Sequence, residues 1–214
     1  AIISDYNALQ TGLVIFWMGV PAFLLMPVLP FMIRRIHIRI AVGAGMFIMA
    51  LSCFVSINLT AESGGGVFTE SQFLRGIGMI LTMMFLNQAT VASVAKEDAG
   101  DASGIFNAAR NLGGSFALAG LASFQDQRLW HHSRRMEETL NANSPRLQEY
   151  LDGMTASLGS PQAALEMLSG IIQRDAFVMT YNDVFFAMGA ITLVTVPLVL
   201  FLKPLPKNLS LSMH

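Results

Sequence analysis

The sequence is poor in charge and in cysteine, and each shortage excludes a class of protein. Charged residues make up only 13% of the 214 residues, against about 25% in an average soluble domain. The formal net charge of −1 offers no basic surface, so we expect no nucleic-acid partner. The single cysteine, Cys53, can form neither a disulfide within the chain nor a cysteine-based metal site.

Motifs for catalysis or metal binding are also missing. The sequence has no nucleophile–base pair, phosphate-binding loop or zinc motif. The adjacent histidines His131 and His132 lack further ligands at metal-site spacing. We therefore expect neither an enzyme nor a metal site.

Apolar sequence, by contrast, is abundant. Hydrophobic residues make up 53% of the chain, and the mean hydropathy is +0.54. A helix needs about 20 apolar residues to cross the core of a bilayer. We predict five transmembrane helices, at about 11–33, 40–59, 71–94, 102–124 and 184–202. The first contains Pro21, Pro27 and Pro30, which membrane helices tolerate where neighbours satisfy the freed carbonyl groups.

Basic residues in short loops indicate the orientation of these spans. Arg34, Arg35 and Arg39 follow the first span, and such residues favour the cytoplasmic side. The chain opens at Ala1 without the features of a signal peptide, so we expect it to be part of a longer protein. We predict an outward-facing lead-in at 1–10, four transmembrane helices at 11–125, a periplasmic loop at 126–181, a last transmembrane helix at 182–203 and a cytoplasmic tail at 204–214.

The predicted periplasmic loop contains helical patterns. Residues 133–151 and 162–174 both show the amphipathic spacing of a helix. Gly153, Gly159 and Pro161 lie between them and favour a break. We expect a small cap of short amphipathic helices outside the membrane.

The fourth predicted span carries polar residues on one face. Asn107, Arg110 and Asn111 recur at helical spacing, and polar groups inside a span are costly unless they face protein or water. Arg110 is too deep to reach the membrane surface easily. The pattern favours a cavity lined by these three residues; alternatively, Arg110 bonds the carbonyl groups of a broken helix.

The third predicted span combines amides with methionines. Gln72 lies near its start, Asn87 near its end, and Met79 and Met83 lie between them. Methionine adapts to varied apolar shapes, which suits a promiscuous drug surface. Ordinary packing between helices or contact with lipid explains the same pattern.

Glycines recur in small groups within the predicted spans. Such residues allow helix backbones to approach closely in membrane bundles, and we expect that role at Gly43, Gly45, Gly76, Gly78, Gly100, Gly104, Gly113, Gly114 and Gly120.

Carboxylates precede the last two spans. Asp98 and Asp101 lie before the fourth span, and Asp183 lies before the fifth. A carboxylate can cap a helix N-terminus and interacts favourably with its dipole. Asp183 has a second interpretation, as a proton-accessible carboxylate at the outer mouth.

Two stretches carry a resemblance to a known family. Residues 72–78 read QFLRGIG, and residues 98–115 read DAGDASGIFNAARNLGGS. They resemble the fourteen-helix drug:proton antiporters of the major facilitator superfamily, the EmrB/QacA type, which show R-G-x-G followed by G-x-A-S-x-x-x-N-x-x-R-x-x-G-G-S. The resemblance covers about residues 8–204, and residues 130–150 are similar to the long periplasmic loop of the EmrB branch.

One turn departs from the family pattern. The family has Gly-x-x-x-Asp-Arg between the first two of these spans, where this chain has Pro30 for the glycine and Arg34 for the aspartate, and keeps Arg35. The departure removes the carboxylate of the family's cytoplasmic latch or moves the acidic partner elsewhere.

The resemblance implies an all-α polytopic protein of the bacterial inner membrane. The chain would be the C-terminal portion of a major facilitator fold, with five transmembrane helices and a periplasmic helical loop. The implied activity is proton-driven efflux of amphipathic or cationic drugs, with no cofactor and the proton as coupling ion. A periplasmic adaptor (a membrane fusion protein) and an outer-membrane channel are the implied partners.

Two other functions remain open. The same fold could export an organic anion, such as a siderophore or a fatty acid, and Arg110 would then contact the carboxylate of the substrate. A non-transporting membrane scaffold, whose loop binds a partner, is the third hypothesis.

Overall fold

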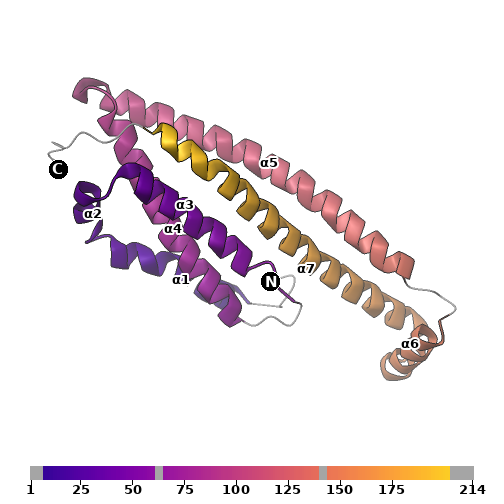
Figure 1. The fold of residues 1–214 in the computed structure, drawn as a ribbon. Helices are drawn as coiled ribbons and strands as arrows, with labels where there is room; N and C mark the ends of the chain where they lie inside the picture. Colours follow the sequence, from indigo (N-terminus) through magenta and orange to yellow (C-terminus); the bar gives the residue numbers. More distant parts are fainter. Residues whose placement is uncertain (1–6, 61–64, 140–143, 203–214) are drawn as a thin grey trace.

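A computed structural model describes residues 7–60, 65–139 and 144–202. These residues form helices and contain no strand, which confirms the predicted all-α fold. The tail predicted at 204–214 and most of the lead-in at 1–10 lie outside the described residues. The helices are α1 Ala8–Leu25, α2 Leu29–Arg35, α3 Ile38–Val55, α4 Gly65–Ala92, α5 Ala99–Thr139, α6 Pro145–Leu158 and α7 Pro161–Thr195, with the 3₁₀ helices η1 Lys96–Asp98 and η2 Val196–Phe201 (Figure 1).

The first predicted span is two helices instead of one. The chain leaves the helix after Leu25 and starts α2 at Leu29. Pro27 lies in this turn and Pro30 in the first turn of α2, where a proline has no amide hydrogen to lose from the helix. Pro21, in contrast, is buried inside α1. The prediction of a continuous helix over 11–33 was wrong because two closely spaced prolines end α1.

Helices α1, α3 and α4 form a tight bundle, and glycines set the spacing between α3 and α4. A Cβ atom added to Gly45 would lie 2.9 Å from the Gly78 carbonyl oxygen, and one added to Gly78 would lie 2.6 Å from the Gly45 carbonyl oxygen. A Cβ atom on Gly76 would collide with the Met18 carbonyl group of α1. The expected close approach is therefore confirmed at these three glycines.

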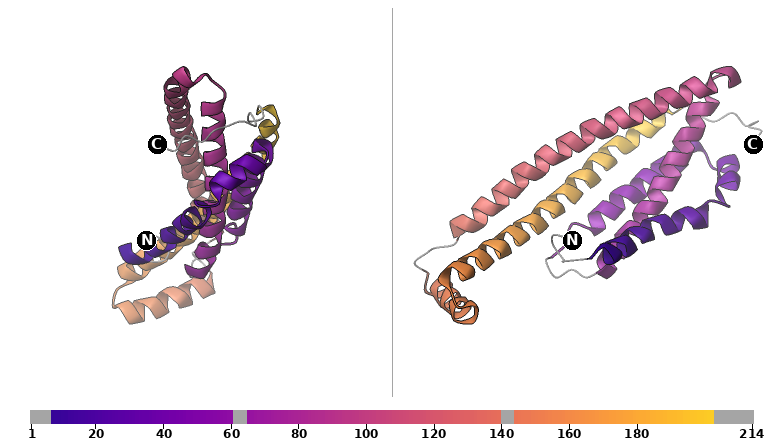
Figure 2. Two further views of the ribbon diagram at one scale, coloured as in Figure 1. Left: turned by 90° about the vertical axis from the view of Figure 1, so that its left-hand side faces the viewer. Right: turned by 180° about the vertical axis from the view of Figure 1, so that it is seen from behind.

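Helices α5 and α7 form a long pair beside this bundle. Figures 1 and 2 show them side by side and extending past the other helices toward α6. Helix α5 continues without a break past position 125, and α7 is already helical before position 182. These are the two positions at which the sequence suggested that the membrane ends. Gly159, with φ of +78°, separates α6 from α7 as expected. Gly153, however, lies inside α6, residues 133–151 are divided between α5 and α6, and residues 162–174 belong to α7 instead of a separate short helix.

The two ends of the bundle differ in the residues and helices that lie there. At one end, Ile38, Val42, Leu81, Phe85 and Val199 form a buried cluster that joins α3, α4 and η2. At the same end, the Arg39 side chain donates a hydrogen bond of 2.8 Å to the Leu202 carbonyl oxygen. Helix α6 lies beyond the opposite end (Figure 1). The basic turn after α2 and the end of η2 thus share one end, whose cytoplasmic location stays a prediction.

Three helices of the described chain are long and apolar enough to cross a membrane. They are α1, α3 and the combined helix Pro161–Phe201. Large apolar side chains lie exposed around the bundle, among them Phe23, Phe116 and Val194, each more than three-quarters exposed. Such extensive apolar surface indicates contact with lipid. Helices α4 and α5 carry more polar residues, and their crossing of the membrane stays a prediction.

Candidate functional site

The polar residues predicted to line a cavity lie on an uncovered stretch of α5. Asn107, Arg110 and Asn111 are all exposed. Helix α5 packs along α7 and touches α4, and residues 107–120 are exposed throughout. Arg110 lies eleven residues into the helix, about 16 Å from its start at 1.5 Å per residue. The structure therefore leaves the three side chains uncovered, on a stretch of α5 that is exposed on every side, and their contact with a substrate stays a prediction.

The predicted residues of α4 also avoid the buried face of their helix. Ser71, Leu81 and Phe85 are buried among neighbouring helices. The residues predicted to form a drug surface lie on the other side of the helix, where their side chains are half-buried or exposed: Gln72, Met79, Met83 and Asn87. Their spacing of seven, four and four residues places them along one face of the helix.

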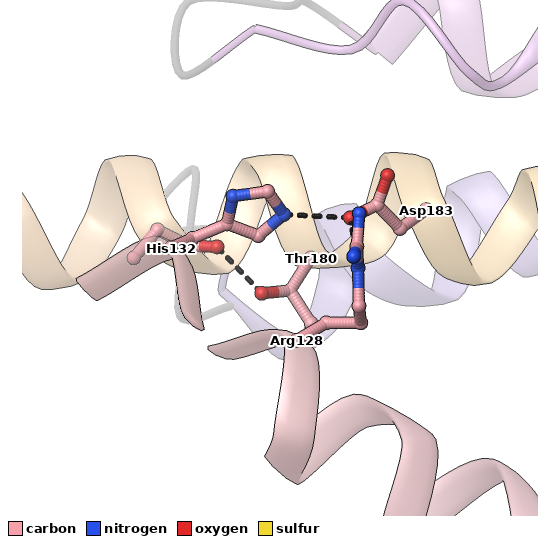
Figure 3. A network of polar contacts seen from close by, with 5 residues as sticks. Arg128, His132, Thr180 and Asp183 are labelled. Atoms are coloured by element: carbon pink, nitrogen blue, oxygen red, sulfur yellow. Dashed lines mark hydrogen bonds and ion pairs between the residues drawn. The ribbon is translucent and has the colours of Figure 1, made fainter. Parts of the chain in front are cut away.

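An ion cluster that the sequence analysis missed joins α5 to α7. Asp183 Oδ2 accepts hydrogen bonds from Arg128 Nε at 2.7 Å and from His132 Nε2 at 2.6 Å (Figure 3). The His132 side chain is only 10% exposed, whereas those of Arg128 and Asp183 are 38% and 30% exposed. Beside the cluster, the buried Thr180 hydroxyl donates to the Ala176 carbonyl oxygen within α7.

The expected role of Asp183 as a helix cap was wrong. Helix α7 starts at Pro161, where the Ser160 side chain accepts a hydrogen bond from the Ala163 amide. Asp183 therefore lies in the middle of a helix and caps neither end. The sequence suggested a cap because the apolar stretch begins at Val184, but a helix can begin well outside the membrane. Its accessibility to protons stays a prediction.

Asn182, next to Asp183 on α7, fastens α7 to the backbone of Leu59. The Asn182 side chain donates to the Leu59 carbonyl oxygen at 2.9 Å and accepts from the Leu59 amide at 3.1 Å. Further along α7, the Arg75 guanidinium of α4 lies 5.4 Å from the centre of the Phe185 ring. Residues 182–185 thus connect α7 with α5, with the segment after α3 and with α4.

The remaining predicted residues lie near helix ends. The Arg35 guanidinium lies over the Phe31 ring at 4.7 Å, and Arg39 contacts Leu202; the side chain of Arg34 lies outside the described part. Asp98 ends η1, and Asp101 lies in the first turn of α5. Both carboxylates are exposed near the α5 N-terminus, where the helix dipole favours them.

Comparison with known proteins relates the chain to exporters. The colistin resistance protein EmrB of Acinetobacter baumannii is 25% identical over 205 residues, which cover 94% of this chain and 40% of that protein. The multidrug export protein EmrB of Escherichia coli is 25% identical over 204 residues, with the same coverage. The fatty acid resistance protein FarB of Neisseria gonorrhoeae is 22% identical over 199 residues, 93% of this chain and 39% of that protein. No family model matches the chain.

The fold and these relatives define a class: an all-α inner-membrane protein that matches a C-terminal fragment of a major facilitator transporter. Within this class, the relatives fit the EmrB/QacA type, which confirms the resemblance found in the sequence. The chain spans about 40% of the length of these relatives. The names of these relatives describe export and resistance proteins.

Proposed function

We propose that this chain is the C-terminal part of a proton-driven exporter of amphipathic or cationic drugs. The observation that carries the proposal is the uncovered polar face of α5, formed by Asn107, Arg110 and Asn111, in a chain whose relatives are exporters. Lipid would penalise such a face strongly. A water-filled cavity between two helical bundles satisfies these groups and provides a substrate site near the middle of the membrane.

Each part of the proposed cavity has a distinct role. The Arg110 guanidinium supplies a fixed positive charge that attracts a carboxylate from another part of the full-length protein. The amides of Asn107 and Asn111 provide hydrogen-bond donors and acceptors on either side of it. Met79 and Met83 of α4 form the adaptable apolar wall. No cofactor is needed, because proton entry drives the rocking of the two bundles.

The long pair of helices provides a surface for partners outside the membrane. The end of α5, the start of α7 and α6 extend past the bundle (Figure 2). A periplasmic adaptor protein binds this projection in our proposal and connects the transporter to an outer-membrane channel. The continuous helices support this arrangement because they hold the projection firmly in line with the membrane segments.

Efflux measurements on the full-length gene product test the proposal. Proteoliposomes with an imposed pH gradient would be loaded with a lipophilic cation, and efflux compared between the wild type, Arg110→Ala and Arg110→Lys. Arg135→Ala is the matched control, because Arg135 is an exposed arginine of the same helix outside the predicted span. We expect Arg110→Ala to abolish efflux, Arg110→Lys to restore part of it and Arg135→Ala to leave it unchanged. Normal efflux by both Arg110 variants would refute the cavity.

A second candidate, export of an organic anion, has one specific observation in its favour. A relative over 93% of the chain is a fatty acid resistance protein, and the exposed Arg110 guanidinium is a natural partner for a carboxylate. Competition separates the two candidates: a medium-chain fatty acid that is itself transported, with no efflux of the cation, would favour the anion exporter.

A further inference from the structure

The cluster of Arg128, His132 and Asp183 holds one anion between two cationic or potentially cationic groups. An ionised carboxylate only accepts hydrogen bonds, so both neighbours must donate to Asp183 Oδ2. His132 then carries a hydrogen on Nε2, and its Nδ1 atom is the nitrogen that can take up a further proton. Imidazole is the side chain that changes charge between about pH 5 and 8.

Proton uptake on His132 changes the cluster without breaking it. With a neutral imidazole, the Arg128 and Asp183 charges balance. A proton on Nδ1 turns the imidazole into a cation, keeps the Nε2–H···Oδ2 bond and adds an ion pair to it. The bond is charge-assisted in both states because its acceptor is ionised, and the added proton contributes the Coulomb attraction of an ion pair, which water screens little because the His132 side chain is only 10% exposed. Protonation therefore tightens the attachment of α5 to α7.

The groups around the cluster are few within the described residues. From α5, the His131 ring contacts the His132 ring, with 5.6 Å between the centroids. From α4, Arg75 lies over Phe185, two residues along α7 from the carboxylate. The segment after α3 contacts α7 through the backbone of Leu59. Asp183 is the carboxylate that contacts both Arg128 and His132, so its loss removes the α7 group that holds these two α5 side chains.

We propose that Arg128, His132 and Asp183 form a proton-binding latch, which takes up a proton on His132 and thereby strengthens the contact between α5 and α7. The latch lies where the long helix pair meets the bundle, because Asn182 ties the same turn of α7 to Leu59, in the segment after α3. Its place in transport rests on the function proposed above. The attachment itself is a property that can be measured without transport.

Distance measurements between spin labels on the two helices test the latch. Labels on Glu138→Cys and Gln173→Cys, both exposed and both beyond the latch on α5 and α7, would be measured in the full-length protein at about pH 8 and about pH 6, across the range in which imidazole titrates. Background labelling would be measured in the protein without the two introduced cysteines. The variants are Asp183→Asn, His132→Gln and the neighbouring control His131→Gln.

For each variant we expect a particular change in the distance between the labels as the pH falls. In the wild type and in His131→Gln, the short-distance population grows as the pH falls. In His132→Gln, which keeps a hydrogen-bond donor but does not titrate, the distances are independent of pH. In Asp183→Asn the response is lost, because the α7 carboxylate that attracts the protonated imidazole is gone, and Asp183→Glu restores the wild-type response.

Several outcomes would overturn the latch. They are a wild-type distance that ignores pH, an Asp183→Asn variant that responds like the wild type, and a His131→Gln variant that also loses the response. A protein that shows the expected pattern but exports no substrate would support the latch and refute the proposed transport function. The two proposals can therefore fail separately.

Discussion

Glycines in two regions of the molecule have opposite surroundings. In the bundle of α1, α3 and α4, a Cβ atom on Gly45, Gly76 or Gly78 would clash with backbone atoms of a neighbouring helix. In α5, Cβ atoms could be added without any contact within 4 Å at every glycine of the helix, namely Gly100, Gly104, Gly113, Gly114 and Gly120. The expectation of close packing at these α5 glycines is not met within the described chain.

The difference shows that groups of glycines occur both on helices that pack closely together and on a helix that is uncovered. Small residues permit a close approach, but they do not identify the helix that approaches. In α3 and α4 the partner is within this chain. In α5 the same residues lie on a helix whose polar face is also uncovered, which is the arrangement expected if the rest of the full-length protein, or a cavity, lies there.

We expect the largest change in stability from a substitution at Gly76. Gly76→Ala places a methyl group against the Met18 carbonyl group, and the α1 backbone must move. Overpacking of this kind costs about 1–3 kcal/mol. Thermal unfolding of the full-length protein in detergent would show a clearly lower Tm. An unchanged Tm would mean that α1 does not pack against α4 this closely; Gly12→Ala, with open space around the α1 glycine, is the control.

Asn182→Ala should have an effect of similar or slightly smaller size. The change removes both hydrogen bonds to Leu59 and leaves buried backbone groups unsatisfied, which costs about 1–3 kcal/mol. The same unfolding assay measures the loss, with Asn58→Ala as control because Asn58 is exposed. Equal Tm values for the two variants would show that the long pair is not fastened to the bundle at this point.

Thr82→Val tests the interior of the bundle and should be stabilising. Within the described chain, the Thr82 hydroxyl is buried and has no hydrogen-bond partner, so its removal should raise the stability by about 1 kcal/mol. Thr90→Val on the same helix is the matched control, because the Thr90 hydroxyl donates to the Leu86 carbonyl oxygen. A lower Tm for Thr82→Val would indicate that this hydroxyl has a partner in the full-length protein.

The smallest expected effect is at Gly113, and it bears most directly on the comparison. Alanine fits the open space at Gly113 and reduces the entropy of the unfolded chain, which stabilises a helix by about 0.4–1 kcal/mol. We expect a slightly higher Tm for Gly113→Ala. A marked loss of stability would instead show that another part of the full-length protein packs on this face of α5, in the manner of α3 on α4.

The sequence predicted much of the helical architecture because membrane helices have a minimum apolar length. The positions of α3 and α4 agree with the predicted spans to within a few residues, apart from the earlier start of α4. The length rule covers only the apolar part of a helix, since residues beyond that part need not be apolar. For that reason it located neither the end of α5 nor the start of α7.

The candidate site was predictable only in part. The helical spacing of Asn107, Arg110 and Asn111 was enough to place them on one face. The contacts of Asp183 could not be found in this way, because Arg128 and His132 are 55 and 51 residues away in the chain. No spacing rule connects residues on separate helices. A clue was present in the nearby charged and imidazole side chains of α5, Arg128 and His132, and in the aspartate Asp183 that directly precedes the apolar stretch of α7.

The unbroken course of α5 has a mechanical consequence. A helix of 41 residues is about 60 Å long, roughly twice the thickness of the hydrocarbon core. Such a rod acts as a lever: a tilt of about 5° around one end displaces the other by about 5 Å over this length. A small rearrangement around Arg110 is thereby enlarged into a movement at the tip near α6, where a protein outside the membrane could sense it.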